Sequence, residues 1–508
     1  MNGKNWTGLA TQLVVLFTAP LILFGCQRTS LTDSADSASA KLTLLPSLPQ
    51  DQLIQAYFNH SEAAEYLESD RKSPKGKPIQ RAGDNLEQVM IDAVAQAKRE
   101  IKIAVQEFRL PRIAQALAIA ARNGVKIEIV LENNYSTPYS ATSSSQAATL
   151  KGRDRQRYED NKAFIDTNQD GVLSAEEIQT RDALVILDNA KISRRDDTLD
   201  GSKGSGLMHH KFMVIDGKTT IVTSANWTTS DIHGDITNPS SLGNANSLVK
   251  IESSDVANAF AQEFDLMYQG NKFKTRKPDR PVQTFRVGDS KLKLHFSPIA
   301  VKKPWTDSSN SLIADTADQA KTSLDLALFV FSDRQLSDRL SALPPRNVTV
   351  RGLFEPGFFM RSYSNSLDML GIPIDSPCRQ SSRKRIQQPD GLSDRKSSRK
   401  PSRKPKALNS SKPWPINAVS AGVPRLKPGD LLHHKFAIID RTTVILGSHN
   451  WTTAGNTKND ETLMVIENKT IAAHYQREFD RLSKDAILGL HNNACGMKES
   501  PTADPEDP

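Results

Sequence analysis

The spacing of apolar residues changes several times in the first third of the chain, and each change predicts a new element. Residues 84–98 place apolar side chains on one stripe at helical spacing, and Asp84 can cap such a helix. Residues 101–105 form a short apolar run typical of a buried strand. A second helical pattern covers 113–122, and 125–131 is again an apolar run. This alternation predicts an α/β fold.

The same alternation returns later, with strand patterns at 292–296, 324–331 and 348–354 and a helical pattern at 311–321. Two sequence blocks also recur. LMHHKFMVIDGKTTIVTSANWTTSD matches LLHHKFAIIDRTTVILGSHNWTTAG 224 residues later, and AVQEFRLPRIAQAL matches ALFVFSDRQLSDRL 223 residues later. Two blocks at nearly the same offset predict an internal duplication.

The duplication predicts two similar domains, each of a size that one core can support. We expect them at residues 51–275 and 285–492, each with a mixed sheet flanked by helices. Each domain carries an insertion before its histidine block, at 160–180 in the first and at 376–415 in the second. The second insertion is rich in Ser, Arg, Lys and Pro, a composition that cannot bury a core and predicts disorder.

Both ends of the chain are expected to lie outside these domains. Residues 1–26 read as an export signal whose apolar run ends at Cys26, in a setting that resembles a bacterial lipoprotein box. Residues 27–50 read as a tether, and 493–508 as a disordered tail. We therefore expect an exported protein, lipid-anchored to a bacterial membrane and facing the periplasm or the exterior. An ordinary signal or an uncleaved anchor is the alternative.

Charge and cysteine content add two constraints. The net charge of the 508 residues is +8, and eleven Lys and Arg lie between Arg379 and Lys406, so the basicity belongs to the second insertion. That segment is either an electrostatic arm for anionic lipid or nucleic acid, or a solvated loop. The chain has no Cys-x-x-Cys, which argues against a zinc or redox motif. Once Cys26 is processed, Cys378 and Cys495 could pair or remain thiols.

The first insertion contains DTNQDGVLSAEE, which resembles the calcium loop of an EF-hand. Oxygen-bearing residues fall at the ligand positions, and Gly171 supplies the tight turn. The predicted calcium ligands are Asp166, Asn168, Asp170, Ser174, Glu177 and the carbonyl of Val172. The alternative is a plain turn before a helix that Ser174 and Glu177 cap reciprocally. We expect calcium to stabilise the insertion and to take no part in the chemistry.

Each long repeated block keeps the same polar residues in one order. They are His209, Lys211, Asp216, Ser224 and Asn226 in the first copy, and His433, Lys435, Asp440, Ser448 and Asn450 in the second. The histidine and the lysine precede or begin a β-prone run, so they project from one face, and a turn returns the hydroxyl and the amide beside them. His210 and His434 then point to the opposite face, where a structural role is expected.

This set of groups suits a phosphodiester. An imidazole near neutral pH can be a nucleophile or a proton shuttle, whereas an ammonium and an amide bind anionic oxygens. Each domain offers only one such histidine, so both domains must face one gap. One histidine then attacks phosphorus, and the other protonates the leaving alcohol and activates water.

The paired blocks are similar to the His-Lys-Asp signature of the phospholipase D superfamily, which includes phospholipases D, cardiolipin synthases and hydrolases, and bacterial endonucleases. Over residues 50–490, the resemblance implies two α/β domains related by a pseudo-twofold, with the active site at their interface. It also implies phosphohistidine chemistry without a catalytic metal. The implied catalytic residues are His209, Lys211, Asp216, Asn226, His433, Lys435, Asp440, Asn450 and Glu461.

The resemblance leaves the roles of the two histidines open. The family supports its motif histidine with a downstream carboxylate, and Glu461 stands 28 residues after His433, whereas the first copy has Asn246 at that place. In two-domain relatives the first histidine is the nucleophile, which favours His209. The position of Glu461 favours His433 instead.

Three functions fit the pattern. The preferred one is a phospholipase D-like hydrolase or transferase of phospholipids, monomeric because one chain holds both motifs. The second is an exported, non-specific endonuclease. The third is a non-enzymatic, calcium-dependent, membrane-tethered binding protein, which the paired motifs disfavour. The sequence shows no base-stacking or groove-reading module, which argues against specific recognition of DNA.

Overall fold

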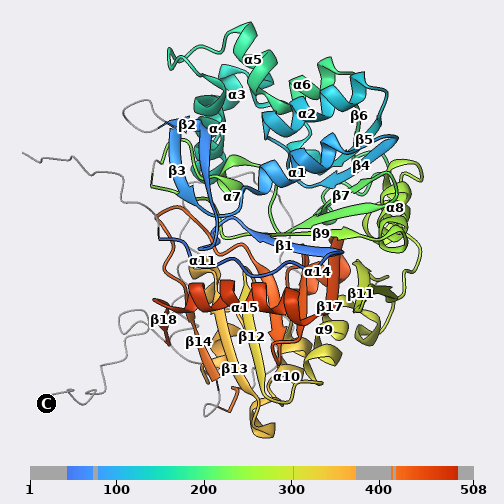
Figure 1. Ribbon diagram of the computed structural model, residues 1–508, viewed down its shortest axis with the longest axis vertical. Coiled ribbons are helices and arrows are strands. Elements are labelled where there is room, and N and C mark those ends of the chain that lie inside the picture. The colour runs from blue at the N-terminus through green and yellow to red at the C-terminus, as the bar shows by residue number, and fades with distance from the viewer. Residues whose placement is uncertain are drawn as a thin grey trace, which may run out of the picture. The chain divides into compact units, whose positions relative to one another are not determined.

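A computed structural model describes residues 43–72, 78–238, 240–300, 302–372, 413–415 and 419–489. Every element below belongs to the unit that begins at Leu44. Figure 1 gives the element labels. Several predicted features lie outside the described residues: the export signal with Cys26, most of the tether and of the basic insertion, Cys378, Cys495 and the tail. Among the described helices, none combines the length and the apolar character needed to cross a membrane.

The first domain is built on a seven-stranded mixed sheet of order β1-β9-β8-β7-β4-β5-β6. Strands β4, β5 and β6 are parallel, and the other neighbours are antiparallel. The strands are β1 (Ile54–Phe58), β4 (Glu100–Val105), β5 (Lys126–Leu131), β6 (Ser193–Asp196), β7 (Lys211–Ile215), β8 (Thr219–Thr223) and β9 (Ser247–Glu252). A separate hairpin joins β2 (Glu65–Lys72) and β3 (Pro78–Ala82).

The second domain carries a nine-stranded mixed sheet of order β10-β11-β17-β16-β15-β12-β13-β14-β18. Its strands are β10 (Gln283–Val287), β11 (Ser290–Ser297), β12 (Ser323–Leu328), β13 (Thr349–Phe354), β14 (Val419–Val423), β15 (Lys435–Ile439), β16 (Thr443–Gly447), β17 (Glu461–Glu467) and β18 (Ile487–Leu488). The run β17-β16-β15-β12-β13-β14 repeats the run β9-β8-β7-β4-β5-β6 of the first sheet. The predicted fold class, two duplicated mixed α/β domains, is confirmed.

Helices flank both sheets (Figure 1). In the first domain they are α1 (Leu86–Ala95), α2 (Pro111–Arg122), α3 (Ser144–Thr149), α4 (Gly152–Ile165), α5 (Ala175–Arg181), α6 (Ala183–Asn189), α7 (Thr229–Ile232) and α8 (Ser254–Tyr268). In the second they are α9 (Ser309–Ala317), α10 (Arg334–Leu340), α11 (Pro356–Phe359), α12 (Ser366–Met369), α14 (Thr453–Thr457) and α15 (Lys469–Ser483).

Local sequence explains several helix starts. Pro111 opens α2, where its fixed φ suits the first turn and its missing N–H costs nothing. The prediction that Asp84 caps α1 is wrong by one residue, because the cap is Asn85, which accepts from the N–H of Gln88. Asp84 instead accepts from the N–H of Phe58 at 2.8 Å and ties β1 to the start of α1.

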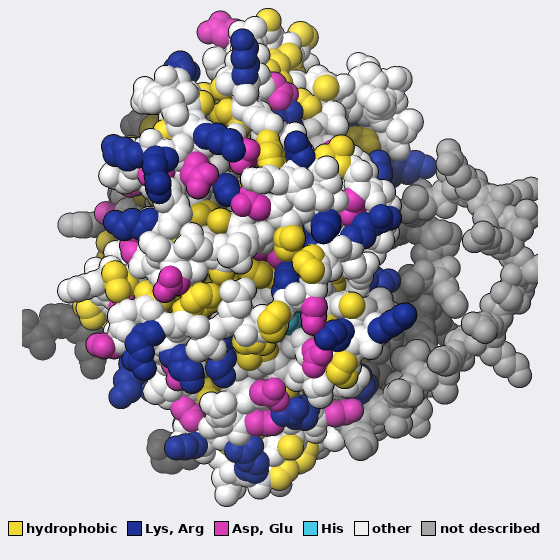
Figure 2. Space-filling view, turned by 90° about the vertical axis from the view of Figure 1, so that its right-hand side faces the viewer, with side chains coloured by type: hydrophobic (Ala, Val, Ile, Leu, Met, Phe, Trp, Pro, Cys, Tyr) yellow, Lys and Arg dark blue, Asp and Glu magenta, His cyan; other side chains and the backbone are white. Residues whose placement is uncertain are grey.

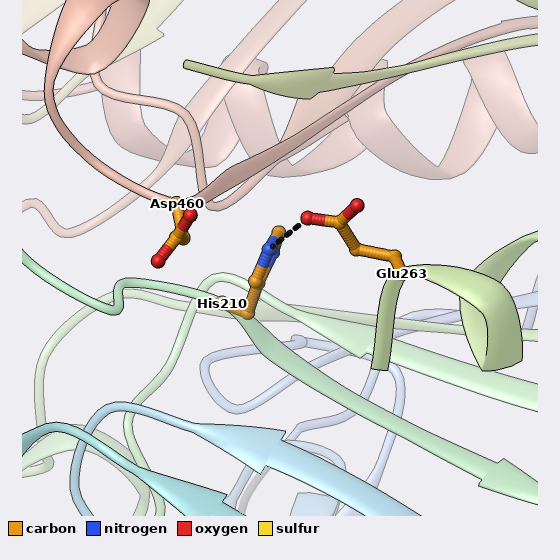
Figure 3. Close-up of side chains that lie close together, drawn as sticks. All are labelled: His210, Glu263 and Asp460. Atoms are coloured by element: carbon orange, nitrogen blue, oxygen red, sulfur yellow. Dashed lines mark hydrogen bonds and ion pairs between the residues drawn. The ribbon is translucent and has the colours of Figure 1, made fainter. Parts of the chain in front are cut away.

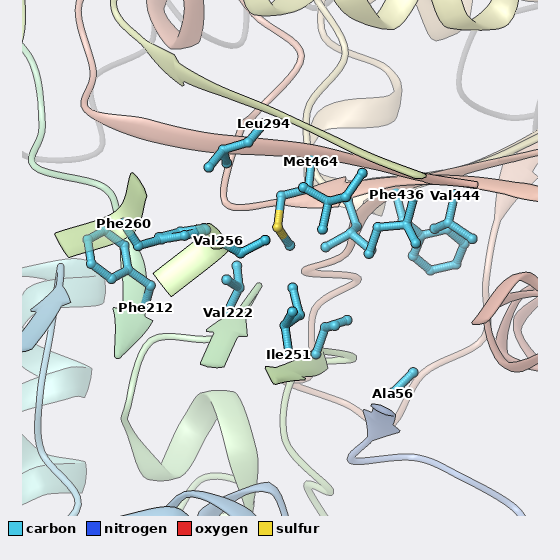
Figure 4. Packing of buried hydrophobic residues seen from close by; sticks show 14 of the residues in the cluster. Ala56, Phe212, Val222, Ile251, Val256, Phe260, Leu294, Phe436, Val444 and Met464 are labelled. Carbon is cyan, nitrogen blue, oxygen red and sulfur yellow. The ribbon is translucent and has the colours of Figure 1, made fainter. Parts of the chain in front are cut away.

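Apolar packing joins the two domains. One buried cluster draws on β7–β9 and α8 of the first domain and on β11, β15–β17 and α15 of the second. Figure 4 shows Phe212, Val222 and Phe260 on one side of it, with Leu294 and Met464 on the other. Two further clusters lie on the outer faces, one beneath α1, α2 and α6 and one beneath α9 and α10. The shared cluster fixes how the two sheets face each other, which positions the site described next.

Candidate active site

The two histidine blocks meet where the domains contact each other. The backbone N–H of His209 donates to the carbonyl of Asp460 at 2.9 Å, and that of His433 donates to the carbonyl of Ala245 at 3.1 Å. Each acceptor belongs to the other domain and immediately precedes the residue that orients the histidine ring. These reciprocal bonds follow the pseudo-twofold and hold both histidines at one interface.

The ring of His209 is oriented by a carboxylate of the other domain. Oε2 of Glu461 lies 2.7 Å from Nδ1 of His209 and also accepts from Oγ of Ser448 at 2.9 Å. An ionised carboxylate only accepts, so Nδ1 carries the proton and Nε2 is left for the reaction. The expectation that Glu461 supports His433 is therefore wrong, because the interface exchanges the partners between the domains.

The ring of His433 has a neutral partner in the equivalent place. Oδ1 of Asn246 lies 3.1 Å from Nδ1 of His433 and accepts from Oγ of Ser224 at 2.7 Å. The amide nitrogen of Asn246 donates to the carbonyl of Asp231 at 2.9 Å, which directs the amide oxygen to the ring. The two histidines thus have matching geometry and different charge around them.

Both imidazoles are neutral at pH 7. Burial lowers the pKa of His209 to about 4, although Glu461 opposes this shift. Burial, followed by the charges of Lys435 and Lys211, holds the pKa of His433 well below 6.5. A neutral imidazole with Nε2 unprotonated is the form that a nucleophile requires.

Lys211 and Lys435 lie fully buried beside the histidines. Nζ of Lys211 donates to the carbonyl of His209 at 3.0 Å, and Nζ of Lys435 donates to the carbonyl of His433 at 2.5 Å. Burial lowers the pKa of Lys211 to about 8, and burial and Lys211 hold that of Lys435 well below its usual value. An entering anion favours the charged form of both lysines, which suits this site to a phosphate group.

A cleft of about 510 Å³ is lined by both histidines and by Asn226 and Asn450. The side-chain oxygens of these asparagines are buried and have no hydrogen-bond partner within the part of the chain that the structure describes. The side-chain nitrogens of the two amides are the donors that a phosphate oxygen in this cleft would need.

Asp216 and Asp440 do not lie in the cleft. They follow the far ends of β7 and β15, in the left-handed conformation with φ of 53° and 49°. The carboxylate of Asp216 accepts from the backbone N–H groups of residues 98–100, and that of Asp440 from those of residues 321–323, at 2.7–2.9 Å. The expectation of a catalytic role is thus corrected to one of clamping the sheet to the turn before β4 or β12.

His210 points away from the cleft, as expected. Its Nδ1 lies 2.8 Å from Oγ1 of Thr462, and its Nε2 lies 3.2 Å from Oε1 of Glu263 (Figure 3). With Asp460, these groups have the spacing of a metal site. However, Nζ of Lys277 lies 2.5 Å from Glu263 and 2.8 Å from Asp460. The ammonium of Lys277 bridges both carboxylates, and Nη1 of Arg280 adds a second positive charge 3.5 Å from Oε2 of Glu263. Cations of the chain itself thus occupy this cluster, which is a structural network of ion pairs.

His434 has the matching role in the second domain, with Nε2 2.8 Å from Oε1 of Glu478 on α15.

The acidic loop joins α4 to α5. The capping box of Ser174 and Glu177 is present, and Oε1 of Glu177 also accepts from the N–H of Thr167 at 2.7 Å. Oδ2 of Asp166 accepts from the N–H of Gly171 at 2.8 Å. The other oxygen, Oδ1, is buried and has no hydrogen-bond partner among the described residues. Such an oxygen at the first ligand position fits a hard cation.

Sequence reasoning missed several cleft residues. Arg157 and Asp160 of α4, Phe329 after β12 and Asp231 of α7 line the cleft, although none belongs to the polar series shared by both blocks. Only Asp231 could have been found from the sequence, because the two repeated blocks differ at that position. The first copy ends in TTSD and the second in TTAG.

Several known proteins are similar to this chain. The family described as "Cardiolipin synthase, PLD-like domain" matches residues 90–268 and 313–483. The mitochondrial cardiolipin hydrolase of Xenopus laevis is 25% identical over 235 residues, which are 46% of this chain and 89% of that protein. The hydrolase of the same name from Xenopus tropicalis is 34% identical over 76 residues, or 15% of this chain and 36% of that protein.

A phospholipase D of Rickettsia felis is 28% identical over 121 residues, which are 24% of this chain and 54% of that protein. Among solved structures, the phosphatidylserine synthase of Haemophilus influenzae superposes with a TM-score of 0.52 at 10% identity, covering 89% of this chain and 90% of the other. At that identity the likeness concerns the fold.

Proposed function

This chain belongs to the phospholipase D superfamily, and from that premise we propose that it cleaves the phosphodiester bond of phospholipids through a phosphohistidine intermediate. The observation that carries the proposal is the pair His209 and His433, one from each domain, lining one cleft with buried lysines beside them. Its named relatives, a cardiolipin hydrolase and a phospholipase D, support a phospholipid as the substrate.

His209 is the better nucleophile. Its Nε2 attacks phosphorus, and the bond between phosphorus and the leaving alcohol breaks. The phosphorylated ring then carries hydrogen on Nδ1 and phosphorus on Nε2, so it is cationic. Glu461, 2.7 Å from Nδ1, stabilises that charge, whereas Asn246 offers His433 only a neutral oxygen.

His433 then handles the protons. Binding of the anionic phosphodiester favours the protonated form of His433, and that form donates a proton to the oxygen of the leaving alcohol in the first step. In the second step it takes a proton from water, the resulting hydroxide attacks phosphorus, and the P–N bond to His209 breaks. Another alcohol in place of water gives transfer. The ammonium groups of Lys211 and Lys435 and the amides of Asn226 and Asn450 bind the non-bridging oxygens as their charge grows.

Incubation of the purified chain with vesicles of phosphatidylcholine or cardiolipin tests the proposal. We expect release of headgroup alcohol, and loss of at least about 10³-fold of the rate in both His209→Ala and His433→Ala. Brief incubation followed by acid-free denaturation is expected to trap the phosphatidyl group on wild-type protein and on His433→Ala but not on His209→Ala. Lipid turnover that survives both substitutions would sink the proposal.

Plasmid DNA, incubated in parallel, tests the endonuclease alternative. The basic insertion, the sequence feature that favours it, lies almost wholly outside the described residues. On the face in Figure 2, basic and acidic side chains are interspersed rather than gathered by sign. This face thus offers no continuous basic track of the kind that binds a nucleic-acid backbone, and the named relatives are a cardiolipin hydrolase and a phospholipase D, so we rank phospholipid above nucleic acid. Nicking of plasmid without turnover of lipid reverses this order.

We also propose that the loop Asp166–Glu177 binds calcium in a structural role. The unpartnered Oδ1 of Asp166 supports this, and Asp166 is also the C-terminal cap of α4. Because Arg157 and Asp160 of α4 line the cleft, calcium would stabilise one wall of the site and supply no reacting group. The proposed export and lipid anchoring at Cys26 rest on the sequence alone, and they would place the site beside a membrane.

A further inference from the structure

The two catalytic histidines differ in the charge of the group on Nδ1. His209 faces the carboxylate of Glu461, and His433 faces the amide of Asn246. Yet His433 must be protonated to act as the acid for the leaving group, although the side chains of two lysines lie nearby. Burial and those lysines disfavour its cationic form. A negative charge close to His433 would offset both effects.

Asp231 lies at the right place. Its Oδ1 is 3.7 Å from Nδ1 of His433, and Asp231 is buried in the wall of the same cleft. Its Oδ2 accepts from the N–H of Asn226 at 2.7 Å, and its Oδ1 accepts from the amide nitrogen of Asn244. The backbone carbonyl of Asp231 accepts a hydrogen bond from the amide nitrogen of Asn246. Asp231 therefore places a negative charge near His433 and also orients Asn246, the hydrogen-bond partner of His433.

The second domain has no side chain at the equivalent place. Thr228 caps α7 by accepting from the N–H of Asp231, and Thr452 caps α14 by accepting from the N–H of Gly455. A Cβ on Gly455 would lie 2.4 Å from the carbonyl of Asn450 and 3.1 Å from Cε1 of His449. That side of the second block is closed, so a carboxylate there is sterically excluded.

Each histidine thus has one carboxylate near its Nδ1, but the two carboxylates do not occupy equivalent positions in the two domains. We propose that Asp231 supplies His433 with the negative charge that Glu461 supplies to His209, and that the pair Asp231–Asn246 replaces a single carboxylate on Nδ1. Asp231 is a positioning residue: it acts on the substrate through His433 and through the orientation of Asn246. This inference rests on the proposed roles of the two histidines.

Other titratable groups also act on His433 and must be held constant. They are His209, Lys211, His434 and Lys435. Phe329 packs edge-on against the ring, with centroids 4.8 Å apart, and shields it from water. None of these groups carries negative charge, so substitutions of Asp231 and Asn246 are the direct way to change the electrostatic potential at the His433 ring.

The first test measures the protonation of His433 by NMR of the full chain labelled with ¹³C at histidine Cε1, in the presence of inorganic phosphate. The signal is assigned by its loss in His433→Gln. We expect Asp231→Asn to lower the titration midpoint of His433 by about one pH unit, and Asp231→Asn with Asn246→Asp to restore it. An unchanged midpoint in Asp231→Asn overturns the inference, and does so whether or not lipid is turned over.

The second test uses leaving groups of different acidity. With a nitrophenyl phosphodiester, whose leaving group needs little protonation, Asp231→Asn should retain its rate within about threefold. With a phospholipid, whose alkoxide needs the proton, the rate should fall about 10- to 100-fold. An equal loss on both substrates indicates a purely structural role and contradicts the inference. Absence of turnover by the wild type on either substrate contradicts the proposed function instead.

Two further variants keep the test decisive. If Asp231→Asn fails to fold, Asn246→Asp alone still discriminates: where Asp231 already supplies the charge, a second carboxylate raises the phospholipid rate less than about threefold. A gain of more than tenfold in the phospholipid rate of Asn246→Asp would mean that Asp231 does not supply His433 with a negative charge, and would overturn the inference. Asp430→Asn is the matched control, since Asp430 lies three residues before His433 but bonds to Ser241 and Leu242 instead. It should leave the His433 midpoint in place.

Discussion

At the scale of single residues, hydrogen bonds across the domain interface distinguish the two motif histidines. His209 and His433 have equivalent surroundings, each with a backbone bond to the other domain, a serine hydroxyl and a side-chain oxygen on Nδ1. The two rings differ in the charge of that oxygen, and His433 also has Oδ1 of Asp231 at 3.7 Å from its Nδ1. A full negative charge stabilises a phosphorylated ring, whereas an amide dipole stabilises it much less, and this difference is the basis for proposing His209 as the nucleophile.

The substitution Glu461→Gln tests this assignment. It keeps a hydrogen-bond acceptor for Nδ1 and removes the charge, so phosphoenzyme formation should slow by about 10²- to 10⁴-fold with little change in KM. Rapid-quench measurement of the first turnover reports that step directly. Asn246→Ala is the comparison. Because Asn246 faces His433, the proposed proton donor, this variant should slow the cleavage of phosphodiesters with poor leaving groups more than the cleavage of those with good leaving groups. A larger loss of phosphoenzyme in Asn246→Ala than in Glu461→Gln would reverse the two roles.

At the scale of elements, the ends of the histidine strands are clamped from outside the cleft. Asp216 and Asp440 take a left-handed backbone conformation and accept three N–H groups each from the turn before the neighbouring strand. Asp tolerates that conformation, and its carboxylate satisfies donors that would otherwise face each other unpaired. The third residue of the His-Lys-Asp pattern thus holds β7 against β4 and β15 against β12.

Replacement of Asp216 by Asn should therefore affect folding and leave the chemistry intact. One amide oxygen cannot satisfy all three donors, so the free energy of unfolding should fall by about 1–3 kcal/mol. Urea unfolding measures the loss, and kcat per folded molecule should stay within about twofold of wild type. Asp440→Asn should behave alike in the second domain. A loss of kcat in Asp216→Asn comparable to that of His209→Ala, with unchanged stability, would show that Asp216 has the catalytic role first expected of it.

The insertion helices give a second test at this scale. If the loop between α4 and α5 binds calcium, calcium should raise the temperature of unfolding by several degrees over chelator, and magnesium should do less. Asp166→Asn and Glu177→Gln should abolish this difference, because they remove ligand oxygens or charge. Glu176→Gln is the matched control, because it removes an exposed carboxylate within the loop at a position that is not a predicted ligand. An equal calcium response in Asp166→Asn and Glu176→Gln would exclude the site.

At the scale of the whole molecule, the domain interface and cores bury histidines that are neutral in the folded chain. Burial lowers the pKa of His209, His295 and His449 to about 4 in each case. The unfolded chain binds protons at these groups near pH 6.5, so below that pH it is favoured. Two buried carboxyl groups act in the opposite sense, since burial raises the pKa of Asp84 to about 6 and that of Glu132 to about 7.

The histidines are the larger group, because burial also lowers the pKa of His60 to about 3. We therefore expect stability to be greatest above pH 6.5 and to fall as the pH decreases from 6.5 to 4. Each histidine contributes a slope of up to about 1.4 kcal/mol per pH unit in that window. Denaturant unfolding at pH 7.5, 6, 5 and 4.5 measures the trend. A stability that stays constant or rises toward pH 5 would contradict it.

The sequence by itself determined the duplication, the fold class and which polar residues recur. Those features are local: strand and helix periods depend on neighbours along the chain, and a repeated block such as 207–231 and 431–455 is visible without any contact map. It also determined that His210 and His434 face away from the motif histidines, because side chains alternate along a strand.

Only the tertiary structure decided which groups meet. Glu461 lies 28 residues from His433 along the chain and yet bonds to His209, 252 residues away, because the domain interface places the start of β17 beside the start of β7. The same packing brings Asp231 to His433. Sequence spacing records order along the chain, whereas a hydrogen bond depends on distance in space, and the apolar cluster between the two sheets sets that distance.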